Sequence, residues 1–193
     1  MSHPQRSIDT RQQAEWDSVT GEALSAGEFR RAMGLFASGV TVLSVSHAGG
    51  VRSMTANAFM SVSLDPPFVV VSIAHTAGFL TFLNSTDPRF GISFLSSKQI
   101  AECAHFGGKP CDTLDPRYDW YRNVPVLQNS LAQFAVKVHT TLDAGDHRLI
   151  VAQLQWMKCA EGKPLLFYGG KLGSHHWQEP VRTESMLDFD SWG

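Results

Sequence analysis

The sequence predicts a single, mainly β domain in which antiparallel strands form a small barrel and a few short helices lie at its periphery. Strand-like runs of β-branched and aromatic residues recur along the chain, and the most apolar of them covers residues 68–74. Turn sequences rich in glycine, aspartate and proline separate these runs. A barrel is the expected arrangement because closure leaves no exposed strand edge. At 193 residues the chain is long enough for one domain with a substantial core.

The first part of the chain predicts an arm followed by one helix. Residues 1–24 mix charged and small polar groups without a steady apolar period, which favours an arm that is loose or packs on a partner subunit. Residues 25–28, Ser-Ala-Gly-Glu, have the spacing of a capping box. Apolar residues then follow at helical intervals, at Phe29, Met33 and Phe36. Gly39 offers a stop, so we expect an amphipathic helix here.

The middle of the chain predicts alternating strands and short helices. Residues 40–46 form a β-rich run, and the glycine-rich turn at 48–50 joins it to a second, antiparallel strand. The buried strand 68–74 is followed by a short helix at 78–84 and by another strand at 89–95. Ser96 or Ser97 is a candidate N-cap for a helix covering about residues 98–105.

The last third predicts a long loop and two hairpins. Residues 106–123 mix glycine, proline, aspartate and aromatic residues, and loops of this length are usually functional or mobile. Two long β-like runs, 131–142 and 147–158, are joined by the turn sequence Asp-Ala-Gly-Asp at 143–146. A further strand pair is expected at 165–168 and 171–177. We therefore place the domain at residues 25–177 and an acidic, aromatic tail at 178–193.

A ladder of small polar residues is the most distinctive chemical feature of the sequence. Thr55, Asn57, Ser61 and Ser63 occupy alternate positions and would share one face of an extended chain. Uncharged hydroxyl and amide groups in register suit a flat heterocycle with polar edges, or a sugar-phosphate chain. The spacing alone slightly favours an ordinary edge strand with a solvated face over a binding site. Residues 65–67, Asp-Pro-Pro, end the ladder in a turn.

Charge and cysteine content limit the possible partners. The formal net charge is −2 and no basic run interleaves with aromatic residues, so we expect no nucleic-acid partner. The polar amino end and the short apolar runs predict neither a signal peptide nor a membrane span, and a cytoplasmic location is expected. The three cysteines are widely spaced, which fits reduced thiols and favours neither a disulfide framework nor a metal site.

Four blocks of the sequence together resemble the flavin reductase family, the small NAD(P)H:flavin oxidoreductases that supply reduced flavin to two-component monooxygenases. The blocks occur in the family's order and span about residues 28 to 176. They are residues 29–33 with 37–42, residues 54–59 with 61–67, residues 94–99, and Gly145-Asp146-His147. The resemblance implies an FMN-binding split β-barrel that is antiparallel and Greek-key-like, a homodimer, and a flavin near the subunit interface.

The resemblance also implies positions for the binding residues. The family's contacts to the flavin ring and ribityl chain correspond to Thr55, Ala56, Asn57, Ser61, Val62 and Ser63. Candidate contacts to the phosphate or adenylate are Thr76, Ser96, Ser97, Lys98 and Gln99. Without the family, residues 96–98 favour a plain helix cap with a solvated lysine, because such caps are common.

The motif Gly145-Asp146-His147 corresponds to the family's contact with the nicotinamide nucleotide. Hydride passes directly from the nicotinamide to the flavin, so His147 is expected to position the nucleotide more than to transfer protons. A solvent-exposed histidine at the end of a hairpin is the alternative. Two departures from the family stand out: Ser53, where glycine is frequent and a tighter loop is expected, and Lys171-Leu172, where an arginine-aromatic pair is frequent.

The sequence therefore predicts an enzyme that reduces FMN (or FAD) with NADH or NADPH and supplies the reduced flavin to a flavin-dependent monooxygenase. Uncharged hydrogen bonds suit a flavin that must bind and then leave. Two alternatives remain open. One is a non-catalytic flavin-binding protein on the same barrel, and the other is a split-barrel oxidase with tightly held FMN.

Overall fold

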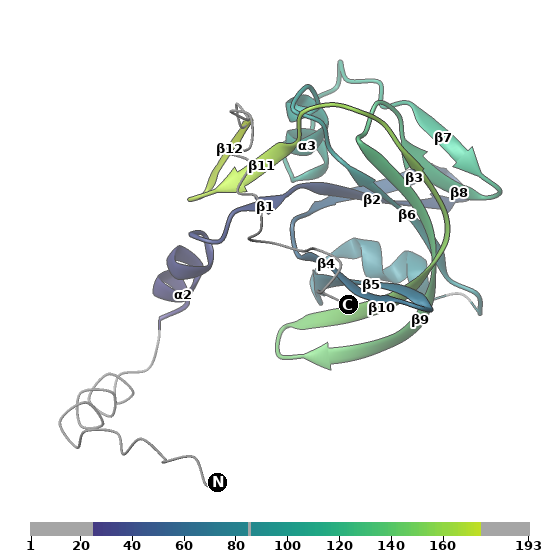
Figure 1. Cartoon of the computed structure of the whole chain (residues 1–193), viewed down its shortest axis with the longest axis horizontal. Coiled ribbons are helices and arrows are strands. Elements are labelled where there is room, and N and C mark those ends of the chain that lie inside the picture. Colours follow the sequence, from purple (N-terminus) through teal and green to yellow (C-terminus); the bar gives the residue numbers. More distant parts are fainter. Residues whose placement is uncertain (1–24, 85, 175–193) are drawn as a thin grey trace, which may run out of the picture.

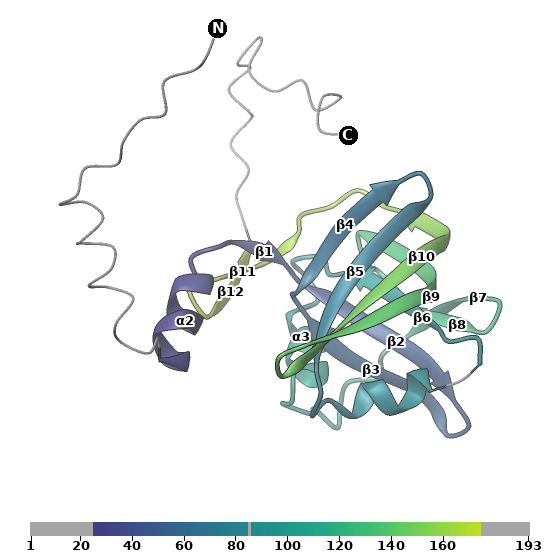
Figure 2. The same ribbon diagram turned by 90° about the horizontal axis from the view of Figure 1, so that it is seen from below.

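The computed structural model describes residues 25–84 and 86–174, and its main feature is a rolled, seven-stranded antiparallel sheet (Figures 1 and 2). Its strands in chain order are β2 (Thr41–His47), β3 (Gly50–Ala56), β4 (Phe59–Leu64), β5 (Pro67–Ala74), β6 (Arg89–Phe94), β9 (Ala132–Ala144) and β10 (His147–Cys159). Their order in the sheet is β3-β2-β6-β9-β10-β5-β4. The outermost strands, β3 and β4, follow each other in the chain, and within the described residues no ladder joins them. The roll is therefore open along one seam.

The main core fills the inside of this roll. Leu43 of β2, Ile73 of β5 and Phe90 of β6 are fully buried there. Burying each such side chain contributes roughly 1.5–3 kcal/mol. The 3₁₀ helix η1 (Gly78–Leu83) closes one side, since its buried Phe79 meets the ring of Phe90 edge-on at 6.2 Å. The helix predicted at 78–84 is thus present in the tighter 3₁₀ form.

A second, smaller core lies on the outer face of β2 and β6. It is covered by helix α3 (Ile100–Phe106) and by the hairpin of β7 (Tyr118–Tyr121) and β8 (Val124–Leu127). Strand β8 crosses β6 so closely that a Cβ atom on Gly91 would lie 1.9 Å from the carbonyl oxygen of Pro125. The interpretation of residues 106–123 as one long loop was partly wrong, because it missed the strand that begins at Tyr118.

Helix α2 (Ala26–Met33) stands away from the barrel (Figure 2), whereas a three-stranded sheet lies against the second core, to which its buried Leu165 belongs. The small sheet contains β1 (Ser38–Gly39), β11 (Leu165–Tyr168) and β12 (Lys171–Ser174), with β11 in the middle. The predicted capping box is confirmed: Oγ of Ser25 accepts from the backbone N–H of Glu28 at 3.2 Å, and the backbone N–H of Ser25 donates to Oε2 of Glu28 at 3.2 Å. The helix ends at Gly34 and not near Gly39, and against the described chain none of its residues is buried.

The predicted fold class, mainly β and antiparallel with short peripheral helices, is confirmed. The predicted runs 131–142 and 147–158 form the longest hairpin, and its turn uses Gly145 at a φ of +62°, where glycine avoids a steric cost. No helix in residues 25–84 or 86–174 is long and apolar enough to cross a membrane. The predicted arm at 1–24 and tail at 178–193 lie outside the described residues.

Candidate functional site

The polar ladder does not form one strand. Strand β3 ends at Ala56 and pairs with β2, whereas β4 begins at Phe59 and pairs with β5 at the opposite edge of the sheet. A bulge between Ser61 and Ser63 then shifts the register of β4, so these two serines leave the simple alternation. The prediction that Thr55, Asn57, Ser61 and Ser63 share one face is therefore wrong, because the chain changes edges at residues 57–58.

The side chain of Thr55 and the backbone of Ala56 are used inside the protein. Oγ1 of Thr55 donates to the carbonyl oxygen of Cys103 at 2.8 Å, which fastens α3 to the edge of β3. The carbonyl oxygen of Ala56 accepts from Oγ1 of Thr41 at 2.7 Å. The Thr55 hydroxyl keeps acceptor lone pairs for a ligand, but its proton is committed.

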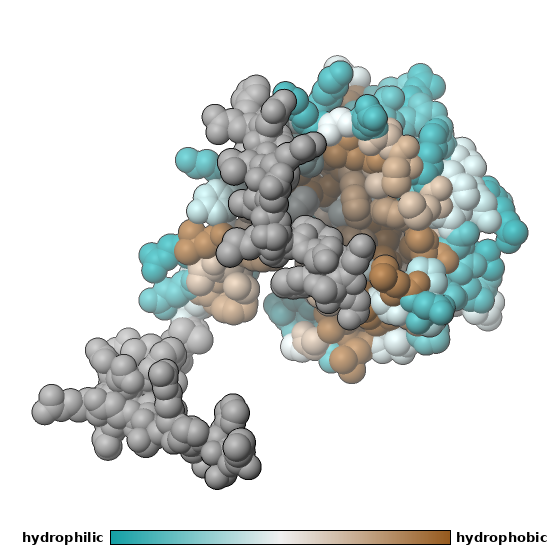
Figure 3. All heavy atoms as spheres, viewed as in Figure 1, coloured by the Kyte–Doolittle hydropathy of each residue, from teal (hydrophilic) through white to brown (hydrophobic). Residues whose placement is uncertain are grey.

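Asn57 lies at the crossing between the two edges and lines two cavities. It is exposed, and the volumes of the cavities are about 340 Å³ and 360 Å³. Both lie in the range of small-molecule sites, roughly 300–1,000 Å³. Their shared lining is Phe36, Ser38, Asn57 and Phe59. Figure 3 shows apolar side chains gathered on the face of the barrel that this view presents. We call these two neighbouring cavities, which share the uncharged amide of Asn57 among largely apolar residues, the Asn57 hollow.

Residues 96–99 lie at the same end of the sheet as Asn57, because Thr41 pairs with Phe94 on one side and with Ala56 on the other. Ser96 and Gln99 are buried. Oε1 of Gln99 accepts from the backbone of Ser96 at 3.0 Å, and its Nε2 donates to the carbonyl oxygen of Gln128 at 2.9 Å. Gln99 therefore has a clear structural role.

The helix predicted at residues 98–105 begins later than expected. Helix α3 starts at Ile100 with Gln99 as its N-cap, and no described side chain makes a capping bond there. The prediction of Ser96 or Ser97 as the cap is wrong. Ser96 pairs with Pro164 in a β-bridge, and the backbone N–H of Ser97 donates to the carbonyl oxygen of Lys163 at 2.8 Å. Of this block, exposed Lys98 and half-buried Ser97 remain accessible to a ligand.

The motif at 145–147 forms the tip of the β9–β10 hairpin. Nδ1 of His147 lies 2.7 Å from Oδ1 of Asp146, and both side chains are accessible. The hydrogen bond and charge of His147 hold the pKa of the Asp146 carboxyl below its usual value. The carboxylate therefore stays ionised and can fix the orientation of the imidazole.

A set of polar side chains beside this tip, those of His75, Asp143 and Arg148, was missed by the sequence reasoning. The backbone of His75 donates to the carbonyl oxygen of Asp146 at 2.9 Å, which brings the exposed Thr76 next to the hairpin. Nε of Arg148 donates to Oδ1 of Asp143 at 2.8 Å, and this bond lowers the pKa of Asp143. His75 and Arg148 directly flank the predicted residues Thr76 and His147, and Asp143 lies two positions before Gly145, so nearness in the sequence was the available signal.

The distance between the predicted flavin residues and His147 follows from strand β5, which lies between β4 and β10. The backbone N–H of Ser72 donates to the carbonyl oxygen of Ala58 at 3.0 Å. Two residues further along β5, Ala74 pairs with His147 on the other side of the strand. With strands about 4.8 Å apart and a rise of about 3.3 Å per residue, Ala58 and His147 lie about 12 Å apart. Ser61 pairs with Val69, about 17 Å along β5 from Ala74. One chain thus brings Asn57 and Ala58 towards His147, but not Ser61 or Ser63.

A family model described as the flavin reductase like domain matches residues 33–176. This chain belongs to the flavin reductase family. The resemblance seen in the four sequence blocks is thereby confirmed. The roles of individual residues stay predictions, because the match covers the domain as a whole.

Named relatives of this flavin reductase family member are similar over most of their length. An NADH-dependent flavin reductase from a Rhodococcus species is 40% identical over 148 residues, which cover 75% of this chain and 84% of the relative. An FMN reductase (NADH) of Agrobacterium fabrum is 39% identical over 151 residues, covering 75% and 83%. The reductase component of a Thermus thermophilus 4-hydroxyphenylacetate 3-monooxygenase is 33% identical over 141 residues, covering 72% and 90%.

Solved flavin reductases share the fold. The flavin reductase PheA2 in its native state superposes with a TM-score of 0.76 at 36% identity, covering 80% of this chain and 100% of that one. The styrene monooxygenase flavin reductase from Pseudomonas putida gives 0.72 at 35% identity, covering 78% and 98%. The sheet described above is therefore the fold of flavin reductases.

Ser53, which stands where the family often has glycine, lies in the middle of β3. Its hydroxyl is 2.8 Å from that of Ser44 and 2.9 Å from that of Tyr118. Burial raises the pKa of Tyr118, so the phenol stays protonated and can donate. The expectation that Ser53 tightens a loop is wrong, because it joins the β7–β8 hairpin to the barrel.

Proposed function

We propose that this flavin reductase family member oxidises NADH and reduces a flavin, FMN or FAD, which then serves a partner monooxygenase. The observation that carries the proposal is the similarity to a relative named as an NADH-dependent flavin reductase, at 40% identity over 84% of that relative. A second relative is named for FMN and NADH together. Both names support NADH as the reductant.

The described residues fit a flavin at the Asn57 hollow. A bound flavin would supply the electron-accepting ring. Phe36 and Phe59 offer apolar walls, and the Asn57 side chain offers an amide donor and acceptor for the polar ring edge. Lys98 carries an exposed positive charge at the same end of the sheet for a phosphate. The chain's own task is to bind and orient both reactants, since hydride transfer needs no protein acid or base.

The catalytic proposal is tested by mixing the purified protein with NADH and FMN and following the nicotinamide absorbance. Oxidation of NADH above the protein-free control is expected, and faster than with NADPH. No consumption with either nucleotide and either flavin would contradict the proposal and favour a non-catalytic flavin binder. A protein that keeps its flavin through dialysis and ignores NADH would favour a split-barrel oxidase instead.

The variant His147→Ala is expected to raise the KM for NADH about tenfold while leaving the dissociation constant of FMN unchanged. The reason is that the imidazole, held by Asp146 at 2.7 Å, positions the nucleotide, and one such contact is worth roughly 1.4 kcal/mol. Steady-state kinetics and flavin titration measure the two quantities. His139→Ala, an exposed histidine within β9, is the control. If the two variants change the KM for NADH equally, His147 has no specific role in binding the nucleotide.

A homodimer is part of the proposal, supported by apolar side chains that one chain leaves uncovered. Phe29 on α2, Met60 on β4 and Leu142 on β9 are 58%, 59% and 63% exposed. Met33 of α2 and Met60 of β4 line the same cavity, so part of this exposed apolar surface is continuous, and continuous apolar surface usually marks an interface. A second copy of the chain is the proposed occupant, because the family implies a dimer and α2 has nothing packed over its apolar side among the described residues.

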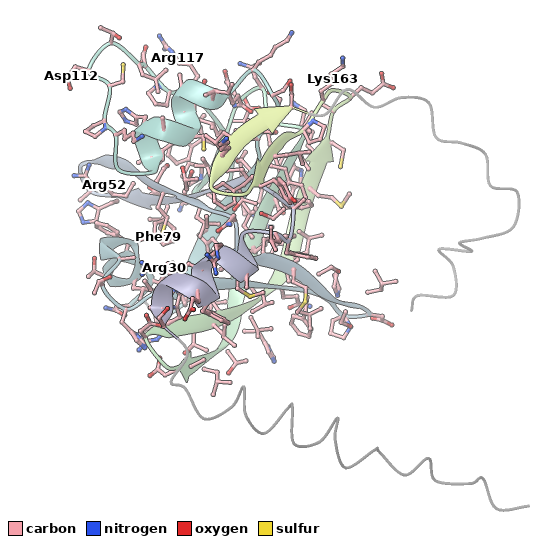
Figure 4. All side chains as sticks on the ribbon, turned by 90° about the vertical axis from the view of Figure 1, so that its left-hand side faces the viewer. Arg30, Arg52, Phe79, Asp112, Arg117 and Lys163 are labelled. Carbon is pink, nitrogen blue, oxygen red and sulfur yellow. The ribbon has the colours of Figure 1, made fainter. Side chains whose placement is uncertain are left out.

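Substituting Phe29 by glutamate is expected to weaken the dimer at least about 100-fold. In a two-fold dimer the substitution removes Phe29 from both subunits of the interface. Burying each phenylalanine contributes roughly 1.5–3 kcal/mol, so both losses add. Sedimentation velocity over a concentration series measures the change. Arg30→Gln, next to it on α2 (labelled in Figure 4), is the control. A Phe29→Glu protein that remains as dimeric as the control would rule out α2 as the interface.

A monooxygenase partner and a cytoplasmic location complete the proposal. Relatives from Thermus thermophilus, Rhodococcus jostii and Rhodococcus opacus are named as reductase components or subunits of monooxygenases, which supports the partner. Cys103, Cys111 and Cys159 all carry free thiols, which supports a reducing compartment.

A further inference from the structure

A third cavity lies far from the Asn57 hollow. Its volume is about 480 Å³, larger than either of the two cavities there. It sits beneath the turn of the β7–β8 hairpin and reaches Ser46 of β2 and Arg89 of β6. Both residues stand at the other end of their strands from Thr41 and Phe94, which flank the hollow. That end is roughly 16 Å away along β2.

The cavity has an apolar floor and a polar rim. The floor is formed by Val45, Phe82, Val124, Ala135 and Val136. The rim is formed by Ser46, Asp87, Arg89, Arg122, Asn123 and Gln155. Sites that bind small organic molecules combine an apolar body with a few polar groups in this way.

The rim carries an excess of positive charge. Nε and Nη2 of Arg89 both donate to Oδ2 of Asp87, at 3.0 Å and 2.7 Å. Nζ of Lys137 lies 2.9 Å from the other carboxylate oxygen of Asp87, Oδ1. One carboxylate thus serves two cations. Arg122 adds a further positive charge, and Asp87 is the one acid among the described residues that line the cavity. A ligand with a negative group at the rim is therefore favoured.

Arg122 is held in place at the mouth. Its Cζ lies 5.5 Å from the centre of the Tyr121 ring, and the ring of Trp156 stacks on Tyr121 at 5.4 Å and 13°. Such cation–π packing restrains a flexible side chain. Its backbone has a φ of +53°, which a bulky residue rarely adopts. A guanidinium restrained before binding loses less entropy when a ligand arrives.

We propose that this cavity binds a small organic anion with an apolar ring, of the aromatic carboxylate class. The ring lies against the floor near Phe82, and the carboxylate meets the guanidinium groups of Arg89 and Arg122. The site does not depend on the flavin reaction, because the cavity stands at the opposite end of the barrel strands.

Three probes separate the ring from the charge. Benzoate has both, benzamide has the ring without the charge, and acetate has the charge without the ring. Isothermal titration calorimetry of the full-length protein is expected to show saturable binding of one benzoate per chain, with benzamide and acetate at least about tenfold weaker. Absence of benzoate binding, or equal affinity for all three probes, overturns the proposal.

Two further measurements locate the bound benzoate. Arg122→Gln is expected to weaken binding about tenfold, whereas Arg117→Gln, an exposed arginine paired with Asp115 (Figure 4), leaves it unchanged. Saturating FMN is expected to leave the benzoate affinity unchanged. Equal affinity of Arg122→Gln and the native protein, or loss of benzoate binding when FMN is added, overturns the proposal. The readout requires no NADH oxidation, so it fails or succeeds separately from the proposed function.

Discussion

Replacing Gly91 by alanine is expected to destabilise the protein by about 3 kcal/mol or more, a large share of the roughly 5–15 kcal/mol that stabilises a typical domain. The added Cβ would lie 1.9 Å from the carbonyl oxygen of Pro125 and 2.9 Å from Cγ1 of Val126. Strand β6 cannot simply move away, because Gly91 pairs with Ser44 on one side and Ala135 on the other. The β7–β8 hairpin must lift from the barrel instead.

Urea unfolding followed by circular dichroism measures this loss. Gly173→Ala is the matched control, since Gly173 also lies in a strand and a Cβ there would meet no atom of the described chain within 4 Å. The control is expected to unfold like the native protein. A Gly91→Ala protein with an unchanged unfolding midpoint would mean that β8 does not cross β6 as described.

Replacing Gln99 by leucine is expected to destabilise the protein by about 3 kcal/mol. Gln99 is 3% exposed, and its amide satisfies the backbone N–H of Ser96 and the carbonyl oxygen of Gln128. Leucine has a similar size but no hydrogen-bonding group. Both backbone groups would then be left without this partner, each at a cost of roughly 1–3 kcal/mol.

The same variant decides between two roles for Gln99. Resemblance to the family predicts a contact with the flavin, whereas the hydrogen bonds describe a residue that holds the start of α3. A lower urea midpoint with unchanged FMN affinity supports the structural role. Unchanged stability with weakened FMN binding supports the flavin contact. Gln155→Leu, an exposed glutamine in β10, is the control for the loss of an amide.

The long strands could be predicted because their signals are local. The runs that became β9 and β10 are long and β-like, and they lie on either side of a turn sequence with a glycine at its third position. Turn chemistry and side-chain pattern act on neighbouring residues, so no knowledge of distant contacts is needed. The capping box at Ser25 and Glu28 is local in the same sense, and it was also found.

The errors arose where contacts between distant parts of the chain determine the local structure. Polar residues stand at alternate positions from Thr55 to Ser63 apart from Phe59, and only the pairing with β2 and then β5 shows that two strands are present. The burial of Gln99 depends on Gln128, which no local pattern connects to it. Strand β8 contains Pro125, which argues against a strand in the sequence although it is tolerated in a two-stranded sheet. The sequence could therefore identify the residues around Asn57 as polar, but it could not show that they connect the two edge strands of the sheet.

The pairing of β1 with β11 sets a limit on how the protein can fold during synthesis. Ser38 pairs with Phe167, and Leu165 completes the small core that contains Val40 and Leu95. A ribosome releases β11 only after almost every other described strand has emerged. Until then Val40 and Leu95 lack part of their cover, so the nascent chain presents an apolar surface to chaperones. The small core is thus completed only when a late strand reaches an early one.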